Sequence, residues 1–366
     1  MKIAYLLGSL NRGGTETLML DVFRNADRCE LDAVCVYRKG GELEEEFNAT
    51  GIAIRQIAFS KNIAGYFYRL RSYLQQQKVN IVHAQQPLDA LYARIACVGT
   101  GIKVILTFHG YDYSNNGFGQ KLLQYIIRRT DKNLYVSRVQ EQYYIRKYKL
   151  NPLKQAVLYN GISFDKLECK TFLATIRQEL RLDEEMLLMG AVGNFNDVRD
   201  QFTTCKFLVL LAKEGVDFHF VFAGKRVEGQ ELLYDLCVEY CKDNGIADKV
   251  SFLGVRNDVP AILKQLDAFV YSTDHDTFGI AVVEALSVGV PVFVNDWEVM
   301  TEVTDNAALA TLYKSKDETD LLAKFMLFLQ DKAPYREKAN KAVEVVRKRY
   351  SIEEHIRKGK FIVGSL

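Results

Sequence analysis

The sequence predicts an α/β protein with two doubly wound parallel sheets, and three observations lead to this fold class. The chain has 366 residues, which at roughly 150 residues per domain is enough for two buried cores. Short β-branched or apolar runs alternate with longer helical patterns, as in parallel sheets that carry helices on both faces. This alternation starts twice, each time with a strand that ends in glycine, a polar turn and a helix.

The strands predicted in the first half are short runs rich in β-branched and apolar residues. They cover residues 2–7, 31–36, 53–57, 80–83, 103–108, 133–136 and 156–159. Helical patterns fill the gaps between them, at about 15–26, 64–77, 88–98, 119–130 and 138–148. Strands separated by helices of this length are expected to pair in parallel, because each connection must cross over the sheet.

The second half repeats this order of elements. Its predicted strands are 187–192, 217–222, 250–252, 268–271 and 290–294, with helices near 200–214, 228–243, 259–265 and 279–288. Charged amphipathic helices follow near 317–330, 334–349 and 352–361. The extended segment Tyr159-Asn160-Gly161-Ile162 predicts a hinge, so we expect Rossmann-like domains at 1–162 and 163–349, facing a cleft lined by strand-to-helix loops.

The composition excludes several classes of protein. The 48 Lys and Arg residues and the 46 Asp and Glu residues give a net charge of +2, so no overall field would attract nucleic acid. No run approaches the roughly 20 apolar residues of a membrane span, and the start MKIAYLLGSLNRGG is interpreted as a core strand rather than a signal peptide. Seven scattered cysteines, an odd number, predict reduced thiols in a cytoplasmic protein.

The stretch 274–292 is the most informative one for function. A strand ends, an acidic loop follows, and Gly279 permits close backbone approach just before a helix begins. The first amides of a helix have no partner within it, and the helix dipole favours an anion, so this predicts a phosphate-sized site. Glu284 follows Asp276 by eight residues, so both carboxylates are expected to face the cleft.

Here the sequence resembles the retaining glycosyltransferases of family 4, which have the GT-B fold and carry Glu-x7-Glu followed by Ala-x3-Gly-x-Pro-Val. Asp276 replaces the first glutamate, and the rest of the signature is matched by Glu284, Ala285, Gly289, Pro291 and Val292. The resemblance spans the chain. It includes Gly13-Gly14, Thr107-Phe108-His109-Gly110, Tyr159-Asn160-Gly161-Ile162, the loop Gly193 to Arg199, Phe222-Ala223-Gly224, Phe252-Leu253-Gly254 and Asn257-Asp258-Val259.

The resemblance implies an enzyme that moves a sugar from a nucleoside-diphosphate sugar to a hydroxyl acceptor with retained configuration. The implied acceptor is a lipid-linked or growing saccharide in surface polysaccharide synthesis, and neither a metal nor another cofactor is implied. The N-terminal domain would hold the acceptor and the second domain the donor. In the family the last helix packs back on the first domain, here at about 350–366.

The resemblance also implies the site residues. Asn194 and Arg199 stand where the family has an arginine and a lysine on the donor diphosphate, and we hypothesise that Lys225, after the next strand, restores the missing charge. Glu284 would bind the ribose, and the loop from Gly254 to Val259 the base. The implied catalytic residues are His109, Asp276 and Arg199. The implied donor-binding residues are Gly13, Gly14, Asn194, Lys225, Gly254, His275, Thr277, Phe278, Gly279, Ile280 and Glu284.

Alternatives stay open at several of these positions. His109 is either a ligand near the reacting sugar or a structural cap, and Gly13 with Gly14 either approaches a ligand or forms a tight turn. Asp274-His275-Asp276 also resembles an Asp-x-Asp metal site, and Cys237 with Cys241 a zinc pair, although buried thiols are favoured for the cysteines. For the whole chain the alternatives are a non-catalytic sugar-nucleotide-binding protein and a sugar-nucleotide epimerase.

One region departs from the balanced charge. Between residues 120 and 154 nine basic residues stand against only Asp131 and Glu141, and five tyrosines lie among them. A mixture of cations and aromatic rings suits the surface of an anionic membrane, so we expect peripheral contact with the inner face of a membrane. The alternatives are an ordinary solvated helix face and, with no recognisable module to support it, nucleic-acid binding.

Overall fold

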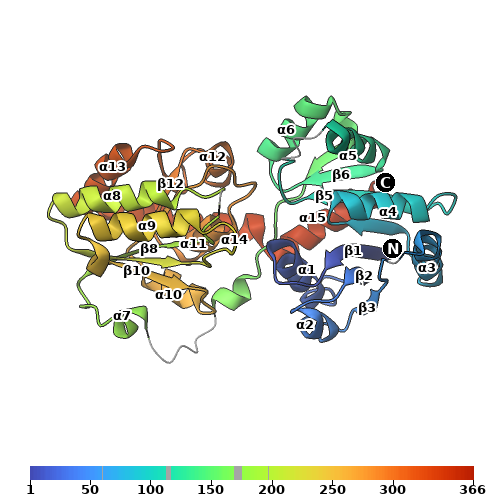
Figure 1. Cartoon of the computed structure of the whole chain (residues 1–366), viewed down its shortest axis with the longest axis horizontal. Helices are drawn as coiled ribbons and strands as arrows, with labels where there is room; N and C mark the ends of the chain where they lie inside the picture. Colours follow the sequence, from blue (N-terminus) through green and yellow to red (C-terminus); the bar gives the residue numbers. More distant parts are fainter. Residues whose placement is uncertain (60, 113–116, 169–174, 197) are drawn as a thin grey trace. The chain divides into compact units, whose positions relative to one another are not determined.

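The structure is a computed structural model that describes residues 1–366 except 60, 113–116, 169–174 and 197. The chain divides into two compact units, shown in Figure 1. The first unit comprises Met1–Ile162 and Tyr350–Leu366, and the second comprises Ser163–Arg349. Each contains one parallel sheet with helices, so the predicted class of two Rossmann-like α/β domains is confirmed.

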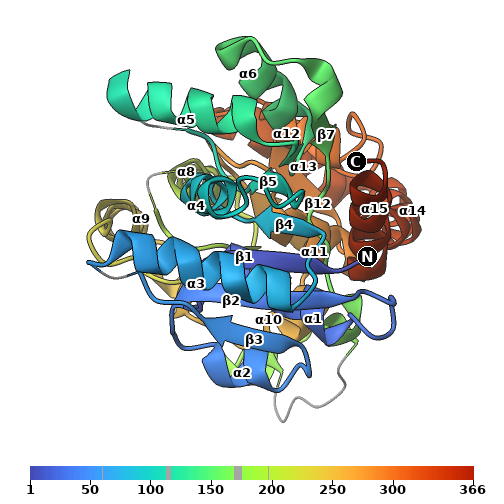
Figure 2. The ribbon, with the colours of Figure 1, turned by 90° about the vertical axis from the view of Figure 1, so that its right-hand side faces the viewer.

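The first unit contains a 7-stranded sheet with the order β3-β2-β1-β4-β5-β6-β7. Its strands are β1 Ile3–Ser9, β2 Ala33–Lys39, β3 Ala53–Gln56, β4 Ile81–Ala84, β5 Lys103–Phe108, β6 Lys132–Tyr135 and β7 Gln155–Val157. Its α-helices are α1 Gly14–Arg24, α2 Glu44–Asn48, α3 Ile63–Gln76, α4 Pro87–Ala96, α5 Gly117–Arg129, α6 Arg138–Tyr148 and α15 Ile352–Gly364, and η1 Pro152–Lys154 is a short 3-10 helix. Figure 2 shows β5, β4, β1, β2 and β3 side by side in this order.

Alternate residues of each central strand fill two cores, one on each face of this sheet. Tyr5 and Leu7 of β1 pack with α1 and α15, whereas Leu6 of the same strand packs with α3 and α4. β1 pairs in parallel with both β2 and β4, so Ile3 lies opposite Ala33 on one side and Ile81 on the other. A strand buried on both faces needs a nearly continuous apolar sequence, which explains the run at the start of the chain.

The C-terminal helix belongs to the first unit. The backbone N–H of Ile162 donates to the carbonyl of Tyr350 at 2.8 Å, and that of Ile352 donates to the carbonyl of Ile162 at 3.0 Å. A Cβ atom on Gly161 would lie 2.7 Å from Cβ of His355 and 2.9 Å from Cα of Ile352. Gly161, predicted at a hinge, is therefore a site of close packing against α15.

The second unit contains a 6-stranded sheet with the order β10-β9-β8-β11-β12-β13. Its strands are β8 Leu187–Val192, β9 Phe218–Ala223, β10 Val250–Gly254, β11 Ala268–Tyr271, β12 Val292–Asn295 and β13 Thr311–Tyr313. Its helices are η2 Phe164–Leu167, α7 Ile176–Glu179, α8 Gln201–Lys213, α9 Leu232–Asp243, η3 Ala247–Lys249, α10 Val259–Gln265, α11 Ile280–Val288, α12 Glu298–Val303, α13 Glu318–Gln330 and α14 Ala333–Tyr350.

The elements that were not predicted are short. They are α2, η1, η2, α7, η3, α12 and β13, none longer than six residues. Such segments contain too few residues for a repeating apolar pattern to be recognised. Cys237 and Cys241 are buried in the core of the second unit, as favoured from the sequence. Among the helices that the structure describes, none has the length and apolar character to span a bilayer.

Candidate active site in the second unit

The candidate site lies at the point where the strand order of the second sheet reverses. β8 pairs with β9 on one side and with β11 on the other, so the loops after β8 and β11 leave the same edge in neighbouring positions. Ligands of open α/β sheets bind at such switch points. The two loops are joined directly, because Arg199 and Thr273 form an antiparallel bridge and the N–H of Asp274 donates to the carbonyl of Val198 at 3.3 Å.

Polar side chains of the two loops and of strand β12 hold these loops in place. Asp200 accepts hydrogen bonds from the N–H of Thr203, at the start of α8, and from the Ser272 hydroxyl at 2.8 Å. The Asn295 amide, at the end of β12, accepts from the N–H of Thr273 at 3.0 Å and donates to its carbonyl at 2.8 Å. Thr273 and Asn295 are fully buried, so the bonds are shielded from water. The site therefore rests on a rigid frame.

Arg199 and Asp276 form the centre of the site. Nη1 of Arg199 donates to Oδ2 of Asp276 at 2.5 Å, and the Tyr271 hydroxyl donates to the same oxygen at 2.5 Å. The guanidinium carbon of Arg199 lies 5.1 Å from the centre of the Tyr271 ring. Burial raises the pKa of Asp276, and the positive charge of Arg199 opposes this rise. Among the described residues, the buried Nε of Arg199 has no hydrogen-bond partner.

Helix α11 begins beside this pair and requires glycine before it. Gly279 has φ +82°, which is left-handed, and a Cβ atom there would lie 2.6 Å from Cε of Met300. Both the backbone angle and the space thus favour glycine. Phe278 is buried and Ile280 is exposed, while Thr277 and Glu284 are half-buried. Glu284 lies in the second turn of the helix, and Ala285 and Leu286 after it are buried in the core.

Asn194 and Lys225 lie in neighbouring loops, as the strand order predicted. The Asn194 side-chain oxygen accepts from the N–H of Lys225 at 2.9 Å, and the N–H of Phe195 donates to the Lys225 carbonyl at 3.0 Å. A Cβ atom on Gly224 would lie 2.0 Å from the carbonyl oxygen of Gly193, so the two loops approach closely. The Lys225 residue is exposed at this edge. Asn194 thus joins the loops by its amide group.

Other predicted residues lie at the same edge of this sheet. The carbonyl of Gly254, at the end of β10, accepts from the N–H of Gly224 at 2.8 Å. In the loop that follows, Arg256 forms ion pairs with Asp258 at 2.6 Å and with Glu179 at 2.9 Å. His275 is exposed. Arg256 was not singled out from the sequence, because its partner Glu179 is far away along the chain.

Tyr271, Trp297 and Lys316 were also missed as parts of the site. Trp297 donates from Nε1 to the Asp276 carbonyl at 3.3 Å, and its ring centre lies 5.5 Å from that of His275. Lys316 forms an ion pair with Asp274 at 2.9 Å. Tyr271 is the last residue of β11 and Trp297 is the single tryptophan of the chain, so position and rarity were signals that pointed to them.

The two carboxylates of the Asp274-His275-Asp276 sequence form ion pairs with two different cations. Asp274 pairs with Lys316, and Asp276 pairs with Arg199. Nowhere in the described part of the chain do three His, Cys, Asp or Glu side chains gather in a group that would hold a metal ion.

The remaining predicted residues, His109, Gly13 and Gly14, lie in the first unit. Nε2 of His109 donates to the Gln85 side-chain oxygen at 2.8 Å, which places the imidazole proton on Nε2. Burial, with a smaller effect of His355, lowers the pKa of His109 to about 3. Gly13 caps α1 with an extended backbone and Gly14 is its first residue, where a Cβ atom would meet nothing within 4 Å. His109 is thus a neutral imidazole with one nitrogen bound to Gln85.

Comparisons with known proteins agree with this architecture. Residues 174–349 match the family described as Glycosyl transferases group 1, and residues 12–166 match Glycosyltransferase Family 4. The chain is 23% identical to the O-antigen biosynthesis glycosyltransferase WclY of Escherichia coli, with 91% of this chain and 94% of that protein covered. It is also 23% identical to the UDP-Gal:alpha-D-GlcNAc-diphosphoundecaprenol alpha-1,3-galactosyltransferase of Escherichia coli, over 81% of this chain and 79% of that one.

Solved structures share the fold. The structure of Anabaena HepE in complex with UDP superposes with a TM-score of 0.88 at 16% identity, covering 100% of both chains. That of WaaG, a glycosyltransferase involved in lipopolysaccharide biosynthesis, gives a TM-score of 0.71 at 15% identity, covering 99% of this chain and 100% of that one. These likenesses and the two parallel sheets confirm the GT-B fold. With both halves matched by the two family models, the chain belongs to the group 1, family 4 glycosyltransferases.

Proposed function

We propose that this glycosyltransferase moves a sugar from a nucleoside-diphosphate sugar to a hydroxyl acceptor with retained anomeric configuration. The observation that carries the proposal is the position of Arg199, which Asp276 and Tyr271 hold beside the start of α11 at the switch point of the second sheet. A fixed guanidinium next to a helix N-terminus is suited to bind a diphosphate.

The proposed chemistry places positive charge where negative charge develops. As the bond between the anomeric carbon and the donor's phosphate oxygen breaks, the leaving diphosphate gains negative charge. Arg199 and the first amides of α11 stabilise this charge in a preorganised way, so the reaction is proposed to need no bound metal. Lys225 adds a second cation, and Glu284 binds the ribose. The acceptor oxygen bonds to the anomeric carbon, and its proton ends on the departing diphosphate.

The proposed acceptor is a lipid-linked or growing saccharide of a surface polysaccharide. Support comes from the relatives, whose names refer to O-antigen biosynthesis and to a diphosphoundecaprenol acceptor. The first unit is proposed to bind this acceptor, with His109 and the loop at Gly13 and Gly14 near the reacting hydroxyl. His109 is proposed to lie there as a neutral imidazole, because burial lowers its pKa to about 3.

Peripheral contact with an anionic membrane is proposed for the first unit. Phe118 and Tyr125 of α5 are 79% and 53% exposed, and Leu153 in η1 is 83% exposed. Nine basic residues lie between positions 120 and 154 of the sequence, and the Arg129 guanidinium carbon lies 5.5 Å from the centre of the Tyr125 ring. Exposed apolar and aromatic groups among cations favour the interface of an anionic bilayer. Flotation with phosphatidylglycerol vesicles tests this, and an absence of salt-sensitive binding would remove the proposal.

Product analysis tests the enzymatic proposal. The chain is incubated with each nucleoside-diphosphate sugar and a lipid-linked acceptor, after a thermal-shift panel of nucleoside diphosphates has identified the nucleotide that raises the melting temperature. A glycoside is expected whose anomeric configuration, determined by NMR, is the same as that of the donor, with and without EDTA. An inverted product, an epimerised donor or an unreacted donor would each contradict the proposal, and the last two would favour an epimerase or a non-catalytic binding protein.

A further inference from the structure

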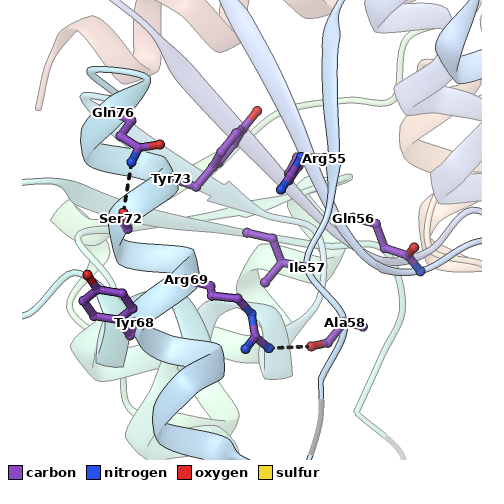
Figure 3. Close-up of a pocket in the computed structure, with 9 residues that line it drawn as sticks. All are labelled: Arg55, Gln56, Ile57, Ala58, Tyr68, Arg69, Ser72, Tyr73 and Gln76. Atoms are coloured by element: carbon purple, nitrogen blue, oxygen red, sulfur yellow. Dashed lines mark hydrogen bonds between the residues drawn. The ribbon is translucent and has the colours of Figure 1, made fainter.

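A pocket of about 510 Å³ lies in the first unit between helix α3 and the end of strand β3. Its volume is within the range of about 300–1,000 Å³ of small-molecule sites. Figure 3 shows side chains of α3 and of the segment at β3 across from one another. The lining residues are Arg55, Gln56, Ile57, Ala58, Tyr68, Arg69, Ser72, Tyr73 and Gln76.

The pocket exists because β3 is the edge strand of the sheet. Ile57 is buried with Leu70 and Leu74 of α3, which fixes the helix over this end of the sheet. Helix positions 69, 72, 73 and 76 lie on one flank of α3, at the spacing of neighbouring turns. Since the sheet order ends at β3, no further strand covers this flank, and its polar side chains line the pocket.

The pocket is positively charged. It contains the guanidinium groups of Arg55 and Arg69, and none of its nine lining residues is Asp or Glu. Arg69 donates to the Ala58 carbonyl at 3.3 Å, which ties its side chain to the segment after β3. In the described part of the chain, neither arginine forms an ion pair, whereas Arg38 of the neighbouring strand is paired with Asp89 at 2.8 Å. Two unpaired guanidinium groups favour a carboxylate or a phosphate group.

The other lining residues suit a sugar ring. Tyr68 is 73% exposed and Tyr73 is half-buried, so both present aromatic surface with a polar hydroxyl. Burial raises the pKa of Tyr73, and the positive charge of Arg55 partly offsets this rise. Ser72 and Gln76 form a hydrogen bond at 3.2 Å and, with Gln56, offer further donors and acceptors. This set combines apolar faces with hydroxyl and amide groups.

We propose that this pocket binds a carboxylate-bearing sugar of the acceptor saccharide, an inference that rests on the proposed function. Arg55 and Arg69 bind the carboxylate, and Tyr68 and Tyr73 contact the pyranose ring. β2 separates β3 from β1, where the loop with Gly13 and Gly14 begins, so the pocket is distinct from the candidate acceptor residues. It is proposed to hold a sugar remote from the reacting hydroxyl.

NMR titration with D-glucuronate, and with D-glucose as the neutral match, tests the pocket on the full chain. Glucuronate is expected to bind several-fold more tightly than glucose. Arg55→Gln and Arg69→Gln are each expected to weaken glucuronate binding by about fivefold or more, since charge-assisted hydrogen bonds are lost. Tyr68→Ala is expected to weaken the binding of both sugars. Lys61→Gln removes an exposed cation outside the lining, and glucuronate binding is expected to stay unchanged.

Two further experiments distinguish a sugar carboxylate from the other anions that two arginines could bind. In the first, inorganic phosphate displaces glucuronate and the Tyr68→Ala variant binds glucuronate as well as the wild-type chain does. This result would overturn the proposed sugar site in favour of a simple anion site. Arginine-dependent binding to phosphatidylglycerol vesicles without glucuronate binding would overturn it in favour of a lipid headgroup. Equal binding of glucuronate and glucose, or normal binding by both arginine variants, would also overturn it.

Experiments can distinguish a failure of the proposed sugar transfer from a failure of the proposed pocket. The melting temperature of Arg55→Gln, whose residue lies in an exposed strand, is the folding control, and Lys61→Gln is expected to leave transfer to a short neutral acceptor unchanged. If the wild-type chain forms no glycoside but binds glucuronate through the arginines, the proposed reaction is wrong and the pocket stands. If it forms the glycoside and no probe binds, the pocket is wrong and the reaction stands.

Discussion

Nη1 of Arg199 lies 2.5 Å from Oδ2 of Asp276, and this ion pair joins the loop after β8 to the loop after β11. The two residues are 77 positions apart in the sequence. The family resemblance implied a catalytic role for Asp276, and in the structure its Oδ2 accepts hydrogen bonds from Arg199 and Tyr271. The carboxylate is thus placed to hold the cation that is proposed to bind the diphosphate.

Asp276→Asn is expected to lower both donor affinity and turnover. An amide keeps the size of the side chain but removes the charge that holds Arg199. Losing one partner of a partly buried ion pair costs about 3 kcal/mol. At a subsaturating donor concentration this corresponds to a roughly hundredfold lower rate. Steady-state kinetics with varied donor concentration measure this. Asp274→Asn, which affects the ion pair with Lys316, is the control and is expected to have a smaller effect. Equal losses in both variants would contradict the positioning of Arg199 by Asp276.

Tyr271→Phe is expected to have a milder effect than Asp276→Asn. The ring stays beside the Arg199 guanidinium, and only the hydrogen bond to Asp276 is lost, which is worth about 1–2 kcal/mol. The donor KM measured for Tyr271→Phe, Asp276→Asn and the double variant forms a mutant cycle. The double variant is expected to resemble Asp276→Asn alone, because both changes act on the same carboxylate. Fully additive effects would show that the two residues act independently.

Lys225→Ala is expected to weaken donor binding and turnover by about threefold to tenfold, the effect of one partly exposed cation on a diphosphate. Its backbone, which Asn194 binds, stays in place, so the loops are expected to keep their structure. Lys242→Ala removes an exposed lysine of α9 and is the matched control. Donor affinity and turnover equal to those of the wild-type chain would remove Lys225 from the site.

Gly279→Ala is expected to lower the free energy of unfolding by about 2–4 kcal/mol, through backbone strain and overpacking. The strain comes from φ +82°, and the overpacking from Met300 at 2.6 Å. Gly245→Ala is the matched control, because Gly245 has φ +70° and nothing within 4 Å of a Cβ atom. Urea unfolding of both variants separates strain from overpacking. If Gly245→Ala is as destabilised as Gly279→Ala, the contact with Met300 has no effect.

The stability of the first unit is expected to fall as the pH falls. Burial lowers the pKa of His83 to about 3, whereas a histidine of the unfolded chain titrates near about 6.5. Between these values the unfolded state binds more protons, so stability is full above pH 6.5 and decreases towards pH 3, by about 1.4 kcal/mol per pH unit for each such histidine.

Urea unfolding of His83→Gln at about pH 7 and pH 5 measures this slope. The variant is expected to lose less stability between the two conditions than the wild-type chain, because glutamine does not titrate. An unaltered slope in His83→Gln would show that the titration of His83 makes no contribution.

Local sequence patterns were enough to predict both sheets and most of their helices. Strands such as β1 and β11 are continuous apolar runs, and Gly279 lies at the boundary where the loop ends and α11 begins. Apolar periodicity and the need for glycine at a turn both depend on a few neighbouring residues. They can therefore be recognised in the sequence without knowledge of tertiary contacts. The same local signals are absent in β13 and α12, which are too short to show a period.

The sequence by itself therefore determined the fold class and the loops that carry the candidate chemistry, because these follow from short-range patterns and from the signature around Glu284. Only the tertiary structure decided which residues meet. Strand order placed Arg199 against Asp276, and the return of the chain to the first unit packed Gly161 against α15. Strand order also made β3 an edge strand, so Arg55 has a neighbouring strand, β2, on only one side. Contacts between distant segments depend on the order of strands in a sheet, which local patterns do not specify.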